Sequence, residues 1–109
     1  MKLMPQNPYG MGFKIKPNSN SFYELTVWRF SYEKADDGLL VAATEGNSPE
    51  FYKAGAAVVT RSADGWAQIT LKFTVPKQYC DKNISIYIWN SGQSDIYFDD
   101  FCLKQVNNL

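Results

Sequence analysis

Apolar and polar residues alternate along most of this chain, and short polar turns separate the alternating stretches. Every second residue is apolar in the second half of 66–75, and in 83–90 three isoleucines alternate with Ser85, Tyr87 and Trp89. A period of two is typical of a β-strand that buries one of its faces. The whole pattern predicts strands over residues 12–16, 22–31, 39–44, 56–60, 66–75, 83–90 and 95–103.

These strands are short, regularly spaced and separated by turns rich in Gly, Asn, Asp and Pro. Such an arrangement predicts an all-β fold in which two antiparallel sheets form a sandwich. The chain has 109 residues and 45% of them are hydrophobic, which is enough to enclose one core. We therefore expect a single domain over 1–109. Its first residues lack the apolar segment of a signal peptide, and we expect a domain excised from a larger protein.

Composition excludes several classes of function. Eleven basic residues balance eleven acidic ones without a dense cluster, so we expect no nucleic-acid partner. No apolar run approaches the ~20 residues that a transmembrane segment needs. The chain contains no histidine, which excludes Ser-His-Asp and Cys-His nucleophiles, and we expect no enzymatic activity. Cys80 and Cys102 allow either one disulfide or two separate thiols.

The last predicted strand contains two acids among aromatic and aliphatic residues, in the order Asp95-Ile-Tyr-Phe-Asp-Asp-Phe-Cys-Leu103. Acids are poor strand formers, so their position needs a reason. If Phe101 and Leu103 point into a core, the period of two directs Asp99 inward and Asp100 outward. A buried carboxylate has to be paired, capped by backbone N–H groups or bound to a cation. The pattern therefore predicts that Asp99 either has a structural role, as a paired or capped carboxylate, or is a metal ligand.

Several motifs, taken in order, resemble a known family. They are Tyr23-Glu-Leu-Thr-Val-Trp28, Gly65-Trp66, Phe73-Thr-Val-Pro76, Ile84-Ser-Ile-Tyr-Ile-Trp89 and Ile96-Tyr-Phe-Asp-Asp-Phe-Cys-Leu103. Together they resemble the carbohydrate-binding modules that have a galactose-binding-like jelly roll. The resemblance covers residues 12–105, and it implies that an N-terminal strand of the family is missing here. It also implies an extracytoplasmic location, as an accessory domain of a polysaccharide-processing or cell-surface protein.

The same resemblance implies a structural calcium ion on the closing strand. Asp99 matches the part of that strand associated with calcium, and Asp100 is the next candidate ligand. Calcium takes 6–8 oxygen ligands, so two carboxylates are an incomplete set. The alternative is that Asp99 caps backbone N–H groups while Asp100 is solvated.

Aromatic side chains are the candidate ligand-binding residues, because the C–H-rich face of a sugar ring stacks on a flat aromatic ring. Tyr87 and Trp89 lie opposite the three isoleucines of their strand, where a monomeric sandwich ordinarily has polar residues. Trp28 is a further candidate platform. Packing between the sheets or under a loop is the alternative for all three. Trp66 is predicted to belong to the core.

The sequence is compatible with two functions from different classes. The first is noncatalytic binding of a glycan or polysaccharide by the exposed aromatic residues of one sheet. The second is a structural or protein-interaction domain, in which the same rings pack against another domain of the parent protein and bind no sugar. A groove with spaced rings favours the first function, and a flat apolar patch favours the second.

Overall fold

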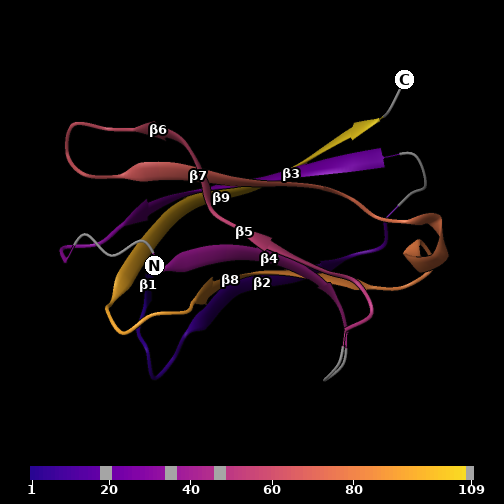
Figure 1. Cartoon of the computed structure of the whole chain (residues 1–109), viewed down its shortest axis with the longest axis horizontal. Helices are drawn as coiled ribbons and strands as arrows, with labels where there is room; N and C mark the ends of the chain where they lie inside the picture. Colours follow the sequence, from indigo (N-terminus) through magenta and orange to yellow (C-terminus); the bar gives the residue numbers. More distant parts are fainter. Residues whose placement is uncertain (18–20, 34–36, 46–48, 108–109) are drawn as a thin grey trace.

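The structure is a computed structural model that describes residues 1–17, 21–33, 37–45 and 49–107. Apart from one short 3₁₀ helix, η1 (Lys77–Tyr79), the regular elements within these ranges are strands (Figure 1). The strands are β1 (Lys2–Leu3), β2 (Tyr9–Ile15), β3 (Ser21–Phe30), β4 (Gly38–Thr44), β5 (Tyr52–Gly55), β6 (Ala57–Arg61), β7 (Ala67–Thr74), β8 (Ile84–Asn90) and β9 (Ile96–Asn107). The predicted all-β fold is confirmed.

The strands form two antiparallel sheets that pack against each other as a sandwich (Figure 1). One sheet has five strands in the order β1-β9-β3-β7-β6, and the other has four in the order β2-β8-β4-β5. The chain changes sheet repeatedly, and a single residue, Ala56, joins β5 to β6 although the two strands belong to different sheets. This strand order is that of a jelly roll. The family resemblance implies a missing N-terminal strand, whereas the segment before Gly12 forms β1 and the beginning of β2.

The hydrophobic core fills the space between the two sheets. Ile84, Ile86 and Ile88 of β8 are fully buried, and so are Leu25 and Val27 of β3 in the opposite sheet. Burying an aliphatic side chain of this size stabilises a fold by about 1.5–3 kcal/mol. Because strand side chains alternate, the residues between these core positions lie on the two outer surfaces of the sandwich. Further core residues are Leu40, Ala42, Ile69, Phe73, Ile96 and Phe98.

A β-bulge interrupts the pairing of β9 with β3. Thr26 pairs with Cys102 and Trp28 pairs with Asp99, so two residues of β9 lie opposite one residue of β3. Asp100 lies within the bulge and has a φ of 56°, in the left-handed region that Asp tolerates better than most residues. The extra residue shifts the alternation of β9 by one position.

Because of the bulge, the Asp99 side chain does not point inward as the sequence predicts. Ile96 and Phe98 are buried before the bulge, whereas Phe101 and Leu103 pack against the core after it. Asp99 is therefore exposed, as is the neighbouring Asp100. The prediction of an inward Asp99 is wrong, because it extended the period of two from Phe101 back through a residue that does not obey it.

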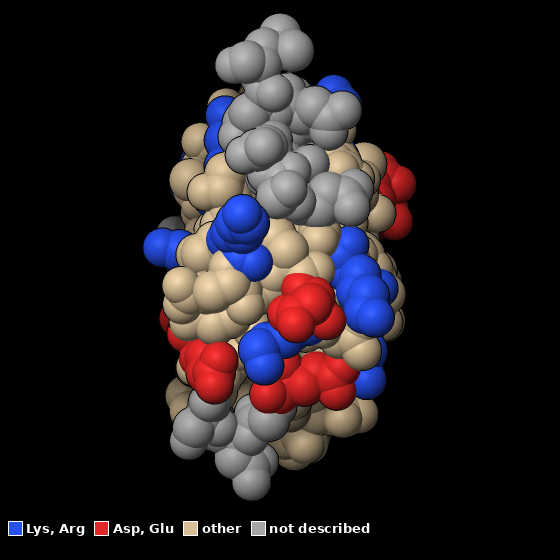
Figure 2. Space-filling model, turned by 90° about the vertical axis from the view of Figure 1, so that its right-hand side faces the viewer, with Lys and Arg blue, Asp and Glu red and all other residues tan. Residues whose placement is uncertain are grey.

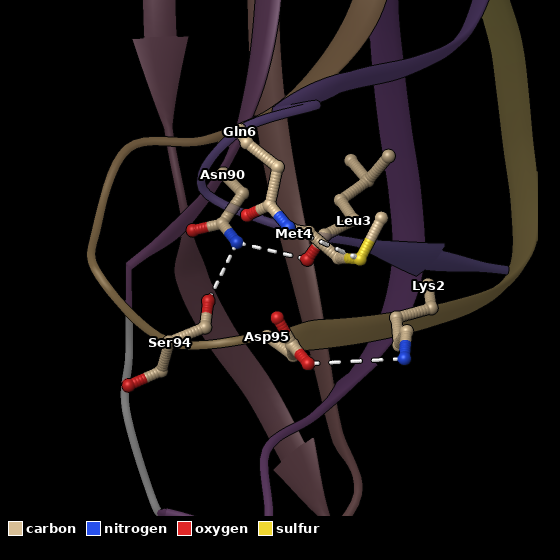
Figure 3. Close-up of polar contacts among 7 residues, drawn as sticks. All are labelled: Lys2, Leu3, Met4, Gln6, Asn90, Ser94 and Asp95. Carbon is tan, nitrogen blue, oxygen red and sulfur yellow. Dashed lines mark hydrogen bonds and ion pairs between the residues drawn. The ribbon is translucent and has the colours of Figure 1, made fainter.

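Asn90, at the end of β8, ties the N-terminal segment to the turn between β8 and β9 (Figure 3). Its amide nitrogen donates hydrogen bonds to the carbonyl oxygens of Leu3, at 2.9 Å, and Ser94, at 2.7 Å. Its side-chain oxygen accepts a hydrogen bond from the backbone N–H of Gly92. The side chain is buried, so these bonds replace solvent for every polar atom that it carries.

We expect Asn90→Ala to lower the free energy of unfolding by about 2–4 kcal/mol, because it leaves buried backbone groups without partners. Denaturant unfolding followed by circular dichroism measures this loss. Asn83→Ala is the matched control: Asn83 is exposed just before the other end of β8, and its replacement should change stability by less than about 0.5 kcal/mol. Equal effects of the two substitutions would contradict the anchoring role of Asn90.

Both cysteines are free thiols in the structure. Cys80 follows η1 and is partly buried, whereas Cys102 is exposed on β9 opposite Thr26. Of the two alternatives that the sequence leaves open, the structure therefore contains the unlinked pair.

Charges of both signs lie side by side on the end of the sandwich that Figure 2 turns toward the viewer. Lys14 pairs with Glu45 at 3.4 Å, and Lys72 pairs with Glu24 at 3.8 Å. This end has no broad field of one sign that would track a phosphate backbone. Across the described ranges, no helix has the length and apolar character needed to cross a membrane.

Candidate functional site

Tyr87 and Trp89 lie on the outer surface of the four-stranded sheet. They alternate along β8 with three fully buried isoleucines, and both rings are only partly covered. β8 is an inner strand of its sheet, flanked by β2 and β4, so the two rings lie near the middle of that surface. The outward orientation of Tyr87 and Trp89 predicted from the sequence is confirmed.

Tyr9 of β2 extends this pair of rings into a continuous strip. It is paired in register with Trp89, and the two rings stack with centroids 6.2 Å apart and planes at 15°. Tyr9 also meets Tyr87 edge to face, with centroids 5.8 Å apart. Tyr9 is 60% exposed, so much of its ring surface faces solvent.

Tyr52 of β5 lies farther across the same surface. It pairs in register with Ala43, and Val41, two residues earlier on β4, pairs with Tyr87. Val41 and Ala43 are buried but do not belong to the cluster between the sheets. They alternate on β4 with the core residues Leu40 and Ala42, so their side chains point to the outer side of the sheet. We call Tyr9, Tyr52, Tyr87 and Trp89, together with this small apolar floor, the aromatic face.

The environment of Tyr87 is consistent with three phenols near one another. Burial raises the pKa of Tyr87 above its ordinary value, and the neighbouring hydroxyl groups of Tyr52 and Tyr9 raise it further. Each would carry a negative charge when ionised, and like charges disfavour one another. The Tyr87 hydroxyl is therefore protonated at neutral pH and can donate a hydrogen bond.

We expect Tyr87 to ionise at a higher pH than an ordinary tyrosine, and we expect Tyr52→Phe to lower its pKa. Because the folded state favours the protonated phenol, its contribution to stability is complete below the ordinary pKa and is lost as pH rises through the raised one. Ultraviolet absorbance during alkaline titration, compared with a Tyr87→Phe variant, measures this ionisation. An unchanged Tyr87 titration in Tyr52→Phe would contradict the proposed proximity of the two phenols.

Polar groups border the aromatic face toward the other end of β8. Ser85 is partly exposed on the same side of β8 as Tyr87, and it pairs in register with Lys14 of β2. Lys14 forms an ion pair with Glu45, which directly follows β4. The surface thus combines flat rings with hydroxyl, ammonium and carboxylate groups.

Sequence reasoning did not identify Tyr9 or Tyr52 as members of this surface. Tyr9 follows Pro8 in a segment without alternation, and Tyr52 begins a four-residue strand that the pattern did not predict. Both reach the aromatic face through strand pairing with distant parts of the chain. Only their residue type could have indicated a role, since tyrosine is enriched among the residues that dominate binding surfaces.

Trp28 does not belong to the aromatic face. It alternates on β3 with buried residues and points outward, but β3 is in the five-stranded sheet, so Trp28 lies on the opposite outer surface of the sandwich. There it pairs in register with Asp99 on one side and Gln68 on the other. The candidates named from the sequence therefore separate into two groups, with Tyr87 and Trp89 on one surface and Trp28, Asp99 and Asp100 on the other.

The second group lines a recess of about 250 Å³ on the five-stranded sheet. Trp66 is partly exposed there and packs against Phe30, with centroids 5.4 Å apart. The prediction that Trp66 belongs to the core is wrong: it precedes β7 just after a turn, and its ring lies outside the sheet. We call this pocket the tryptophan recess; its lining residues are Trp28, Ser62, Asp64, Trp66, Asp99 and Asp100.

The donor set around Asp99 and Asp100 does not fit a calcium ion. Among the residues that the structure describes, no three acidic or cysteine side chains converge closely enough to hold a metal. One oxygen of Asp99 accepts a hydrogen bond from the backbone N–H of Asp100 at 2.9 Å, as a capping carboxylate does. Calcium requires 6–8 oxygens, and binding of this ion stays a prediction without a matching set of ligands.

Comparisons of the chain with models of protein families, with curated proteins and with solved structures found no significant match.

Proposed function

We propose that this protein is a noncatalytic carbohydrate-binding module that stacks a glycan on the aromatic face. The observation that carries this proposal is the contact of Tyr9 with both Trp89 and Tyr87 on the outer surface of the four-stranded sheet. Large rings are ordinarily buried, and several in contact at the surface indicate a binding site. The resemblance of the sequence motifs to carbohydrate-binding modules supports the same proposal.

The chemistry of the aromatic face suits a sugar better than a purely apolar ligand. Indole and phenol rings offer flat surfaces to the C–H groups of a pyranose, while the phenol hydroxyls bond to its hydroxyl groups. Ser85 and Lys14 add polar partners at one border. The rings lie on an open surface rather than in an enclosed cleft of the kind that tunes a catalytic acid, so we propose binding without turnover.

A fluorescence titration with soluble plant and bacterial polysaccharides tests the proposal. The double variant Trp28→Phe/Trp66→Phe retains Trp89 as its single tryptophan, so its emission reports on the aromatic face alone. We expect a saturable blue shift with at least one polysaccharide, because a stacked sugar excludes water from the indole. The absence of a response across a broad panel, with the fold intact by circular dichroism, would contradict glycan binding.

Docking of another protein domain is the second candidate function. Trp89, Tyr9 and Tyr52 form a surface with enough apolar character for such a contact. In that case the parent protein would supply the partner domain, and no polysaccharide would change the emission of Trp89. The titration therefore separates the two functions directly.

A further inference from the structure

The tryptophan recess lies on the opposite side of the sandwich from the aromatic face and has a different chemical character. Trp28 of β3 lies between two acidic segments. Asp99 and Asp100 of β9 border it on one side, and Asp64, in the turn between β6 and β7, borders it on the other. The recess therefore combines indole rings with carboxylates contributed by segments far apart in the sequence.

All the charged side chains that line the recess are acidic. Asp64, Asp99 and Asp100 together give it a formal charge of about −3. The Ser62 hydroxyl donates a hydrogen bond to Asp64 and lowers the pKa of that carboxyl group. These charges lie beside aromatic rings, whose faces also carry negative potential.

Trp28 has a ring surface that other aromatic side chains leave open. Within the described part of the chain, no aromatic ring contacts Trp28, whereas Trp66 rests on Phe30. Trp28 is partly exposed although it lies on β3, an inner strand flanked by β9 and β7. Its exposed surface therefore contributes to the 250 Å³ recess rather than to packing.

Two backbone features hold the acidic residues around Trp28. The bulge in β9 turns Asp99 and Asp100 outward together. On the other side, the Ser62 side-chain oxygen accepts a hydrogen bond from the backbone N–H of Trp66, and Gly65 has a φ of 95°. Bulges frequently re-aim side chains next to binding sites. These features fix the position of the recess, while its charge and its rings determine which ligand it favours.

We propose that the tryptophan recess binds a ligand carrying an organic ammonium group. The indole faces attract such a cation through their quadrupoles, and the surrounding carboxylates complement its positive charge. A neutral ligand of the same shape gains neither interaction. This site is independent of glycan binding at the aromatic face, since the core of the sandwich separates the two surfaces.

Nuclear magnetic resonance of the three indole N–H groups tests the proposal, with choline as the probe. Trp→Phe variants assign each signal. Choline is compared with dimethylbutanol, its uncharged isostere in which carbon replaces the ammonium nitrogen. We expect choline to shift the signals of Trp28 and Trp66 in a saturable manner and to leave Trp89 unchanged. We also expect the affinity to fall as salt is added, since salt screens exposed charges.

Substitutions distinguish the cation site from general surface adhesion. Trp28→Ala and Asp99→Asn should each weaken choline binding by about three- to tenfold, the range expected for one cation–π or charge contact. Tyr87→Phe, on the opposite surface, is the control and should leave the affinity unchanged. Equal shifts with dimethylbutanol, or no saturable shift of Trp28 with choline, would overturn the proposal. Shifts produced by a neutral monosaccharide but not by choline would overturn it too, and would indicate a second sugar site.

Discussion

Trp89→Ala is expected to weaken polysaccharide binding at least about thirtyfold, equivalent to ~2 kcal/mol, the threshold for a residue that dominates an interface. The substitution removes the indole that stacks on Tyr9, and with it the largest flat surface of the aromatic face. The isoleucines beneath stay in place, so the fold should persist. Affinity electrophoresis in gels that contain the polysaccharide measures the loss.

Two further variants serve as comparisons for Trp89→Ala. Tyr9→Ala removes one stacked ring but leaves the indole, so its effect should be smaller, about three- to tenfold. Trp28→Ala removes a ring of the same type from the opposite surface and should leave polysaccharide affinity unchanged. A loss in Trp28→Ala equal to that in Trp89→Ala would show that the glycan site had been assigned to the wrong surface.

Phe98→Ala is expected to have the largest effect on stability, a loss of about 3–5 kcal/mol in the free energy of unfolding. Among the described residues Phe98 has the largest fully buried side chain, and it lies next to Asp99, after which the bulge in β9 begins. A domain of this size has a total stability of only about 5–15 kcal/mol, so the variant should be close to unfolding. Urea unfolding followed by circular dichroism measures the loss, and a change below about 1 kcal/mol would contradict the assigned core.

A substitution at Gly38, which lies against the ring of Phe98, tests how tightly that ring is packed. A β-carbon at Gly38 would lie 2.5 Å from Cζ of Phe98 and 3.0 Å from Cδ of Arg29, closer than packed atoms approach. We therefore expect Gly38→Ala to cost about 1–3 kcal/mol through overpacking. In a Phe98→Leu background the clash with the ring disappears, so the same substitution should cost less. Additive losses in the double variant would contradict this contact.

Local alternation was sufficient to predict the part of the site on β8. The isoleucines at every second position fix one buried face, and Tyr87 and Trp89 then have to point the other way. The sequence also predicts Trp28 as a further candidate platform, but alternation gives only a direction relative to one strand. Which sheet contains that strand depends on pairing with distant segments, so the sequence did not separate Trp28 from Tyr87 and Trp89.

In β9, a single extra residue makes the prediction from a period of two wrong for the side chains before it. Phe101 and Leu103 do pack toward the core, as the sequence suggested, yet Asp99 is exposed because the bulge lies between it and Phe101. A bulge adds one residue without a distinctive sequence signal, apart from the tolerance of Asp100 for positive φ. Asp99 and Asp100 line the tryptophan recess because of that shift, so the sequence pattern did not predict their place there.

The indole N–H spectrum during titration with a polysaccharide that shifts the emission of Trp89 shows which surface of the sandwich binds the glycan. If a glycan stacks on the aromatic face, the signal of Trp89 moves in a saturable manner while those of Trp28 and Trp66 stay in place. Movement of Trp28 or Trp66 with an unchanged Trp89 signal would place the ligand on the opposite surface and contradict the proposed glycan-binding face.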